Sequence, residues 1–458
     1  MEPKQSSPST TSAEHGVIEE PPILPPEIVR QIFSNLKGRF RTLDLLACSL
    51  TCTTWFHEAF PLLGDDLQWI HCSVFDDDGE TITRFAELIT ESHRLRLPHC
   101  DQITQLNISV AYLVNRPLSM QEDGKFCDTS AKAYRDIIRR APNLRTLYIF
   151  TRWPRNSFLS TRDWDRCYDG TKNQILLFFE SIMPLCNSIT GLVFFCESGF
   201  DTFISHVIES VADRLEFLKT RHLTFNDATK RALCLCHSMR DVDIRNTKYR
   251  DVTPVLHCWQ YLEKFCIYDS FSHLDIAEAD RLAIELGTYC PNLVEVVFQQ
   301  CNDDVQMSSQ AMCYLLGRCP NLTHLGATSN QLDDRFLRAL ANGQPHLERL
   351  ILPKCIGIIG HLVKEDAPAW GWWPELRQLV LVECESVLPE FVERLVRECS
   401  KLKTVALPST LEQICGKLLV QLGFRLEHCD EDFEFCYVTD PWWFDMMWQR
   451  VETDNVAI

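Results

Sequence analysis

The sequence lacks the short motifs that mark the commonest enzyme chemistries. It contains neither of the glycine-rich phosphate loops, G-x-x-x-x-G-K-S/T and G-x-G-x-x-G, that bind nucleotides. The G-x-S-x-G nucleophile elbow and the H-E-x-x-H zinc motif are also absent. Because catalysis by these routes requires those residues at those spacings, the sequence predicts a protein that is not an enzyme, has no catalytic residues and uses no cofactor.

The sequence also lacks signals for export or membrane insertion. Its first residues, MEPKQSSPSTTSAEHG, contain no apolar stretch of the kind that a secretory signal needs. No run of about 18 uncharged apolar residues occurs, since the nearest one, from Ser181 to Cys196, is interrupted by Pro184 and Asn187. We therefore expect a protein that is cytoplasmic and/or nuclear and does not bind membranes.

Positive charge is scarce relative to negative charge. The chain has 45 Lys and Arg residues against 63 Asp and Glu residues, a formal net charge of −18. Nucleic acids and anionic membranes are themselves negative, so this balance opposes non-specific binding to either. The sequence predicts no nucleic-acid partner.

The 22 cysteines include no C-x-x-C pair, the spacing typical of zinc knuckles and related sites. The densest group is Cys234-x-Cys236-His237, on a predicted helix. One helical face does not easily present positions i, i+2 and i+3 to a single ion. We predict no metal site.

One short phrase recurs along most of the chain: an anchor residue with apolar residues three and five positions later. Clear copies are APNLRTLYI at Leu144 and CPNLVEVVF at Leu293. From Ile189 onward the anchors follow one another at 23 to 31 residues. Such a period is typical of a solenoid, in which each unit buries its apolar face against its neighbours. The anchors are Ile103, Leu144, Ile189, Leu215, Met239, Leu262, Leu293, Leu322, Leu347, Leu376 and Leu402.

Each phrase is interpreted as a short strand followed by a helix, for example the helices Asp275 to Tyr289 and Ser308 to Arg318. Alternation along a strand directs the residues two, four and six after the anchor to the concave face. These residues mix both charges with aromatics, which favours binding of a protein or peptide target. The predicted target-binding residues are Tyr148, Phe150, Lys219, Arg221, Asp241, Asp243, Arg245, Tyr268, Glu295, Gln299, His324 and Arg349.

Cysteines recur at fixed places in this phrase. Cys290, Cys319 and Cys399 lie three residues before an anchor. Cys301, Cys355 and Cys384 lie eight residues after one. Small, weakly polar thiols at constant positions of a repeat behave as core residues, so we expect them to be buried and reduced.

Residues 22–60 carry a different pattern, typical of three short helices. Pro25 and Pro26 suit a first helical turn, and Glu27 suits its positive end. A unit of about 40 residues is too small to be stable alone, and its apolar residues exceed what its own core can bury. A partner surface is therefore predicted. The apolar residues are Ile28, Ile32, Phe33, Leu36, Leu43, Leu45, Leu46, Leu50, Trp55, Phe56 and Phe60.

Two resemblances follow from these motifs. The segment L-P-x-E-I at Leu24, with I-F-x-x-L at Ile32 and S-L-T-C-x-x-W ending at Trp55, resembles an F-box. The phrase from Cys290 to Cys301 is similar to the cysteine-containing subtype of leucine-rich repeat. Together they resemble F-box proteins with leucine-rich repeats, of the fungal type of substrate receptor. The fold class implied is α/β, a leucine-rich-repeat horseshoe with parallel strands on its concave face, preceded by a small three-helix F-box.

The resemblance implies a role as the substrate-recognition subunit of an SCF-type ubiquitin ligase. Its F-box would bind a Skp-family adaptor and, through it, a cullin, while the repeats bind a target protein that the sequence does not identify. The alternative is a non-catalytic repeat scaffold outside any ligase. The residues that match the adaptor-binding positions are Leu24, Pro25, Glu27, Ile28, Ile32, Phe33, Leu36 and Trp55.

These patterns divide the chain into five parts. We expect a disordered tail at 1–21, the F-box at 22–60, a connector at 61–100, the solenoid at 101–426 and a C-terminal cap or tail at 427–458. The last part is rich in tryptophan. It is interpreted either as a cap on the last repeat or as a segment that contributes to partner binding.

Overall fold

The computed structural model describes residues 24–36, 41–70, 80–115, 125–151, 170–195, 201–221, 223, 225–245, 247, 249–269, 276–300, 307–361, 372–427 and 447–450. The chain forms two compact units, Met1–Leu67 and Gln68–Ile458, which we describe separately. The predicted tail at 1–21 lies outside the described residues. None of the described helices is long and apolar enough to cross a membrane.

The first unit consists of helices α1 (Pro26–Ser34), α2 (Arg41–Ser49) and α3 (Thr53–Gln68). Helix α1 starts with proline at a position where no N–H is needed, as the sequence predicts. Helix α3 continues through Pro61 beyond the predicted end of the segment at residue 60, because Leu63 extends its buried face. The core of this unit contains Val29, Phe33, Leu43, Leu45, Leu46, Ala59 and Leu63.

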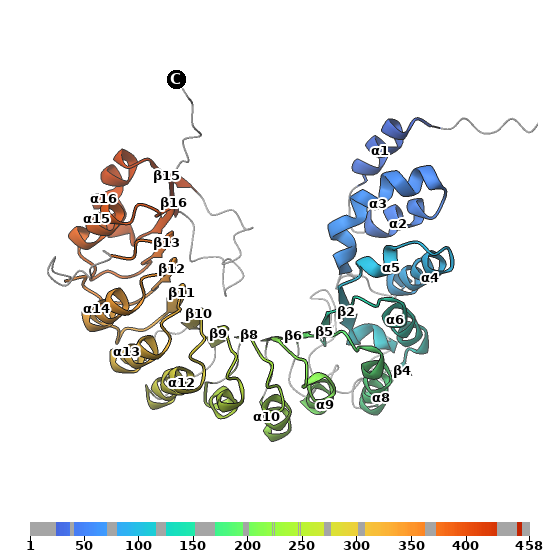
Figure 1. Cartoon of the computed structure of the whole chain (residues 1–458), viewed down its shortest axis with the longest axis horizontal. Helices are drawn as coiled ribbons and strands as arrows, with labels where there is room; N and C mark the ends of the chain where they lie inside the picture. Colours follow the sequence, from blue (N-terminus) through green and yellow to red (C-terminus); the bar gives the residue numbers. More distant parts are fainter. Residues whose placement is uncertain are drawn as a thin grey trace, which may run out of the picture. The chain divides into compact units, whose positions relative to one another are not determined.

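The second unit is built on a long parallel sheet, and this confirms the predicted leucine-rich-repeat fold class. Figure 1 shows its strands along the inner side of the repeat array and its helices along the outer side. Eleven of the strands follow the eleven predicted anchors, each starting two residues after one. They are β2 (Gln105–Ser109), β5 (Thr146–Phe150), β6 (Gly191–Phe195), β7 (Phe217–Arg221), β8 (Asp241–Arg245), β9 (Lys264–Asp269), β10 (Glu295–Gln300), β11 (His324–Ala327), β12 (Arg349–Ile351), β13 (Gln378–Val380) and β14 (Thr404–Ala406).

These strands pair without any shift in register. The residue two positions after each anchor lies opposite its counterpart in the next strand, from Gln105 in β2 to Thr404 in β14. Every anchor is at most 3% exposed. Burial alternates along β5, β7 and β8, with the residues three and five after the anchor inside. The period of the sequence thus sets the register, because a shift by one residue would expose these side chains.

Helices cover the outer side and pack on the helices of neighbouring repeats. The two helices expected from the sequence are confirmed to within one residue, as α12 (Ile276–Tyr289) and α13 (Ser309–Arg318). The other outer elements are α4 (Glu80–Arg94), α5 (His99–Gln102), η1 (Val110–Leu113), α6 (Asp128–Arg140), α8 (Lys172–Ile182), η2 (Met183–Leu185), α9 (Asp201–Val211), α10 (Asp227–Cys234), α11 (Tyr249–Val252), η3 (Thr253–Cys258), α14 (Asp334–Gly343), α15 (Pro389–Glu398) and α16 (Ser409–Gln421).

Further strands extend the sheet at both ends. Strand β1 (Trp69–Ile70) pairs parallel to β2. At the other end β16 (Met447–Arg450) pairs antiparallel to β14, and β15 (Phe424–Glu427) pairs antiparallel to β16. Residues of the predicted C-terminal part therefore pair with the last repeat strand. A separate hairpin joins β3 (Val114–Asn115) to β4 (Lys125–Phe126).

The cysteines of the repeat phrase lie in the core, as predicted. Cys290, Cys319 and Cys399 before the anchors are fully buried, as are Cys355 and Cys384 after them. Each thiol contacts a backbone carbonyl of the preceding repeat; the Cys384 sulfur, for example, lies 2.8 Å from the oxygen of Leu352. Cys301 lies outside the described residues. All 16 described cysteines are free thiols.

Candidate functional site

Helix α1 has two apolar faces. One face carries Val29 and Phe33, which are 1% and 3% exposed and belong to the core of the first unit. The other carries Ile28 and Ile32, and Leu24 lies two residues before the helix; these three residues are spaced four apart and are 43 to 48% exposed. We call these three residues the α1 stripe. A row of exposed aliphatic side chains on one helix face is the usual mark of a docking surface.

The α1 stripe is held in place by contacts from α1 to α3. The rings of Phe33 and Trp55 meet edge to face, with centroids 5.4 Å apart. Arg30 donates through Nε to the Glu58 carboxylate at 2.6 Å, and the Glu58 side chain is 9% exposed. An aromatic pair and an ion pair thus fix the rotation of α1, which decides which residues point outward. The roles of Arg30 and Glu58 could not be predicted from the sequence, because their pairing depends on how α1 packs on α3.

The other residues predicted to bind an adaptor lie around this stripe. Pro25 and Glu27 are exposed, and Leu36 and Trp55 are half-buried. Phe33 is placed differently from the prediction, since it lies inside the unit. Its ring supports α1 and does not line the exposed face. The structure brings Leu24, Ile28 and Ile32 together on that face.

The concave side of the second unit carries a network of charged groups around Asp243. The Asp243 carboxylate accepts two hydrogen bonds from Arg245, from Nε and Nη2 at 3.1 Å each. Lys219 Nζ of the neighbouring strand lies 2.9 Å from the same carboxylate. The Arg245 guanidinium also stacks over the Tyr268 ring, with its central carbon 4.7 Å from the ring centroid. The strands β7, β8 and β9 thus each contribute one or more groups to a single network.

The network continues on the neighbouring strands. Lys264 Nζ lies 3.8 Å from the Glu295 carboxylate. Burial raises the pKa of Asp241 to about 6; the charge of Lys264 opposes the rise, and that of Glu295 adds to it. Burial also lowers the pKa of His324, with Glu295 acting in the opposite direction. The centre of the concave face is therefore a mixed-charge surface on which burial shifts the pKa values of Asp241 and His324.

The remaining predicted concave residues are placed as follows. Tyr148, Phe150, Arg221 and Arg349 are half-buried on their strands, and Phe150 stacks on Phe195 of β6 with ring centroids 4.8 Å apart. Tyr268 departs from the prediction, because it is only 6% exposed and supports Arg245 from below. The side chain of Gln299 lies outside the described residues.

Comparison with known proteins gives a family match within the first unit and a match to a curated relative. Residues 22–63 match the family model described as F-box-like. An F-box/LRR-repeat protein of Arabidopsis thaliana is 35% identical over 81 residues, which are 17% of this chain and 32% of that protein. The match thus spans about a third of the length of this curated relative.

The solved structures that match this chain include a leucine-rich-repeat protein. A yeast complex of Rad7 and Elc1 matches at 14% identity and a TM-score of 0.37, over 81% of this chain and 94% of that chain. A leucine-rich-repeat protein of Leptospira interrogans matches at 12% identity and a TM-score of 0.26, over 67% of this chain and 94% of that one. A complex of TLR13 with RNA matches at 12% identity and a TM-score of 0.29, over 69% and 43%.

Proposed function

The chain combines an F-box-like region with a leucine-rich-repeat fold, and we propose that it is the substrate-recognition subunit of an SCF-type ubiquitin ligase. In this proposal the first unit binds a Skp-family adaptor and, through it, a cullin. The repeats bind the protein to be modified. The protein would act in the cytoplasm, the nucleus or both.

The observation that carries the proposal is the α1 stripe. Leu24, Ile28 and Ile32 lie inside the region that matches the F-box-like model, yet the core of their own unit leaves them 43 to 48% exposed. Complete burial of one aliphatic side chain contributes about 1.5–3 kcal/mol. An adaptor with an apolar groove for one helix face would bury all three at once, because they follow one another at four-residue spacing.

The mechanism of such a subunit is positioning. Joining a target to a scaffold that also carries a conjugating enzyme makes their encounter intramolecular and raises the effective concentration of the target lysine. The proposal therefore requires no bond chemistry from this chain. It requires two surfaces on one chain, and the α1 stripe and the mixed-charge concave face are separate surfaces with different chemistry.

The direct test is binding to a purified Skp-family adaptor, measured by calorimetry with the 458-residue chain. The double substitution Ile28→Asp and Ile32→Asp should weaken binding at least about a hundredfold, because it places two charges in an apolar contact worth several kcal/mol. The matched control is Ile414→Asp on α16. Ile414 is 57% exposed, so this control adds a charge at an isoleucine of the second unit that is also exposed.

Two results would contradict the proposal. Wild-type chain that binds no adaptor at micromolar concentration would remove its basis. Equal loss of binding in the control and in the double variant would show that the α1 stripe has no special role. Adaptor binding without recruitment of a cullin to the same complex would instead favour a repeat scaffold outside a ligase.

A further inference from the structure

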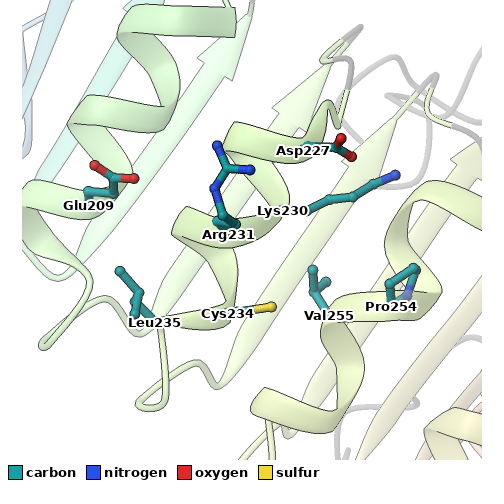
Figure 2. A pocket seen from close by; sticks show the side chains of 8 residues that line it. All are labelled: Glu209, Asp227, Lys230, Arg231, Cys234, Leu235, Pro254 and Val255. Carbon is teal, nitrogen blue, oxygen red and sulfur yellow. The ribbon is translucent and has the colours of Figure 1, made fainter.

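Two cysteines and a histidine meet on the outer, helical side of the second unit. Cys234 is the last residue of α10, and His257 and Cys258 end η3 of the next repeat. One ligand atom from each of the three residues lies within 4.8 Å of the other two. Figure 2 shows the Cys234 sulfur directed away from α10 toward the segment of Pro254 and Val255. Helix α10 of one repeat and η3 of the next repeat thus bring these three side chains together.

Hydrogen bonding fixes the histidine in the form that metals bind. His257 Nδ1 lies 2.9 Å from the carbonyl oxygen of Pro254. A carbonyl only accepts, so the Nδ1 nitrogen carries the proton and the neutral ring keeps a lone pair on Nε2. That Nε2 atom lies 3.2 Å from the Cys258 sulfur. A ring held by a backbone carbonyl, with its other nitrogen turned toward thiols, is the usual arrangement around a metal-bound histidine.

From this geometry we propose that Cys234, His257 and Cys258 bind a thiophilic metal ion of the Zn²⁺ class. Tetrahedral Zn²⁺, with Zn–S of about 2.3 Å and Zn–N of about 2.0–2.1 Å, places its ligand atoms roughly 3.5–3.8 Å apart. The three atoms are already within 4.8 Å, so small side-chain rotations bring them to these distances. Two thiolates balance the charge of a divalent ion. Sulfur and imidazole ligands select zinc over magnesium or calcium.

A groove adjoins this cluster at one of its three members. It has a volume of about 660 Å³ and is lined by Cys234 together with Lys230, Leu235, Pro254 and others, so solvent reaches the cluster on the side of Cys234. Cys236, the nearest other thiol in sequence, is fully buried, and its sulfur lies 3.5 Å from the carbonyl oxygen of Ala232. It therefore remains a core thiol. The proposed site supplies three protein ligands, so a tetrahedral ion bound there would have its fourth position open, as in accessible zinc sites.

Binding must release the thiol protons. Burial, together with the neighbouring Cys234, raises the pKa of Cys258 to about 11, so its thiol is protonated at neutral pH. The ion displaces this proton and that of Cys234 to solvent as the two sulfur–metal bonds form, with no change in oxidation state. A bound ion would join α10 to η3 and so link two consecutive repeats from their outer side.

The test uses the metal-stripped 458-residue chain in a phosphine reductant, titrated with Co²⁺ and then Zn²⁺. One equivalent of Co²⁺ should produce thiolate-to-cobalt absorption, and Zn²⁺ should remove it. The single substitutions Cys234→Ser, Cys258→Ser and His257→Ala should each weaken this binding at least tenfold. The matched control is Cys313→Ser, since Cys313 is also a half-buried thiol of an outer helix but lies outside the cluster.

Several outcomes would overturn the assignment. Site variants that bind cobalt as the wild type does would place the metal elsewhere among the cysteines. A wild-type chain that takes up no cobalt, but forms a Cys234–Cys258 disulfide in air, would make the pair a redox couple instead. His257 is exposed, so His257→Ala should fold normally. Circular dichroism and thermal unfolding check that every variant is folded.

Discussion

Helices α1 and α15 start with similar residues but differ in how much of their apolar surface is buried. Both start with proline followed by glutamate, at Pro26 and Pro389. Helix α15 buries its apolar face, Phe391, Val392, Leu395 and Val396, within the second unit. Helix α1 buries Val29 and Phe33 but leaves the α1 stripe exposed. A repeat helix has neighbours that cover its apolar surface, whereas α1 lies in a unit too small to cover all of its own.

The two units therefore offer different chemistry to partners. The α1 stripe is aliphatic, so its binding energy would come from removing apolar surface from water and should change little with salt. The concave face presents ion pairs such as Lys219–Asp243, whose interactions with a charged partner weaken as salt screens them. Under the proposed function, binding of an adaptor should therefore depend less on salt concentration than binding of a charged target. Four sets of variants test this difference between the two units.

The largest effect is expected inside the first unit. Phe33→Ala should destabilise that unit by about 3–5 kcal/mol, because it removes a buried ring that packs on Trp55. Ile32→Ala, one residue away on the exposed face, should change stability by less than about 1 kcal/mol. Hydrogen exchange of the segment 41–63, followed by mass spectrometry, measures both. Similar exchange rates in the two variants would contradict the assignment of two distinct faces to α1.

An anchor in the middle of the array should show the corresponding effect in the second unit. Leu293→Ala should cost about 2–5 kcal/mol, because Leu293 is fully buried between neighbouring repeats. Leu177→Ala on α8 provides the control, since Leu177 is 61% exposed. Urea unfolding monitored by circular dichroism should show a lower midpoint for the anchor variant only. A midpoint equal to that of the control would mean that the anchors are not core residues.

The third prediction concerns pH and the concave face. The pKa of Asp241 is raised in the folded state from 3.8 to about 6, so the folded protein binds the proton more tightly than the unfolded chain. This contribution to stability is fully present below pH 4 and is lost as the pH rises through about 6. The loss corresponds to about 3 kcal/mol.

Asp241→Asn should therefore be more stable than the wild type at pH 7 and similar to it near pH 4. The measurement is the difference in melting temperature between the two chains across this range. Taking the difference removes the contribution of His324 and Glu295, which face the same region and are present in both chains. A constant difference from pH 4 to pH 7 would show that the Asp241 carboxyl does not carry the dependence.

The smallest effect is expected at a helix cap. The Ser308 hydroxyl accepts a hydrogen bond from the N–H of Ala311 at the start of α13, at 3.2 Å. It also donates to Asp280 at 2.7 Å. Ser308→Ala should cost about 1 kcal/mol, measured by thermal unfolding. In contrast, Pro25 caps α1 without any side-chain hydrogen bond, so Pro25→Ala should have little effect on helix formation. An equal loss in both variants would contradict this difference.

The repeat fold could be predicted from the sequence because the spacing of the apolar residues determines where each strand lies and which of its side chains are buried. The apolar residues three and five positions after Leu144 or Leu293 are both buried in only one strand register. The strands have this register. The burial of Phe33 was harder to predict from the sequence. The sequence groups Ile28, Ile32 and Phe33 on one broad apolar surface, and only the packing of α1 on α3 separates the core residue from the exposed ones.

The cluster of Cys234, His257 and Cys258 could not be predicted from the sequence, because it also depends on how separate elements pack. Sequence spacing directed attention to Cys236 and His237, which are close to Cys234 along the chain. The true neighbours come from the next repeat, after an intervening strand. Finding them requires knowing that η3, which follows β8 and the short helix α11, packs against α10.

The unbroken register of the eleven repeat strands also limits the form of a ligand that crosses them. Adjacent strands are about 4.8 Å apart, whereas an extended chain advances about 3.3 Å per residue, so its side chains fall out of step with the strands. An α-helix advances about 5.4 Å per turn, close to the strand spacing. A helical ligand would therefore present about one turn to each of β7, β8 and β9, where the charged side chains are densest.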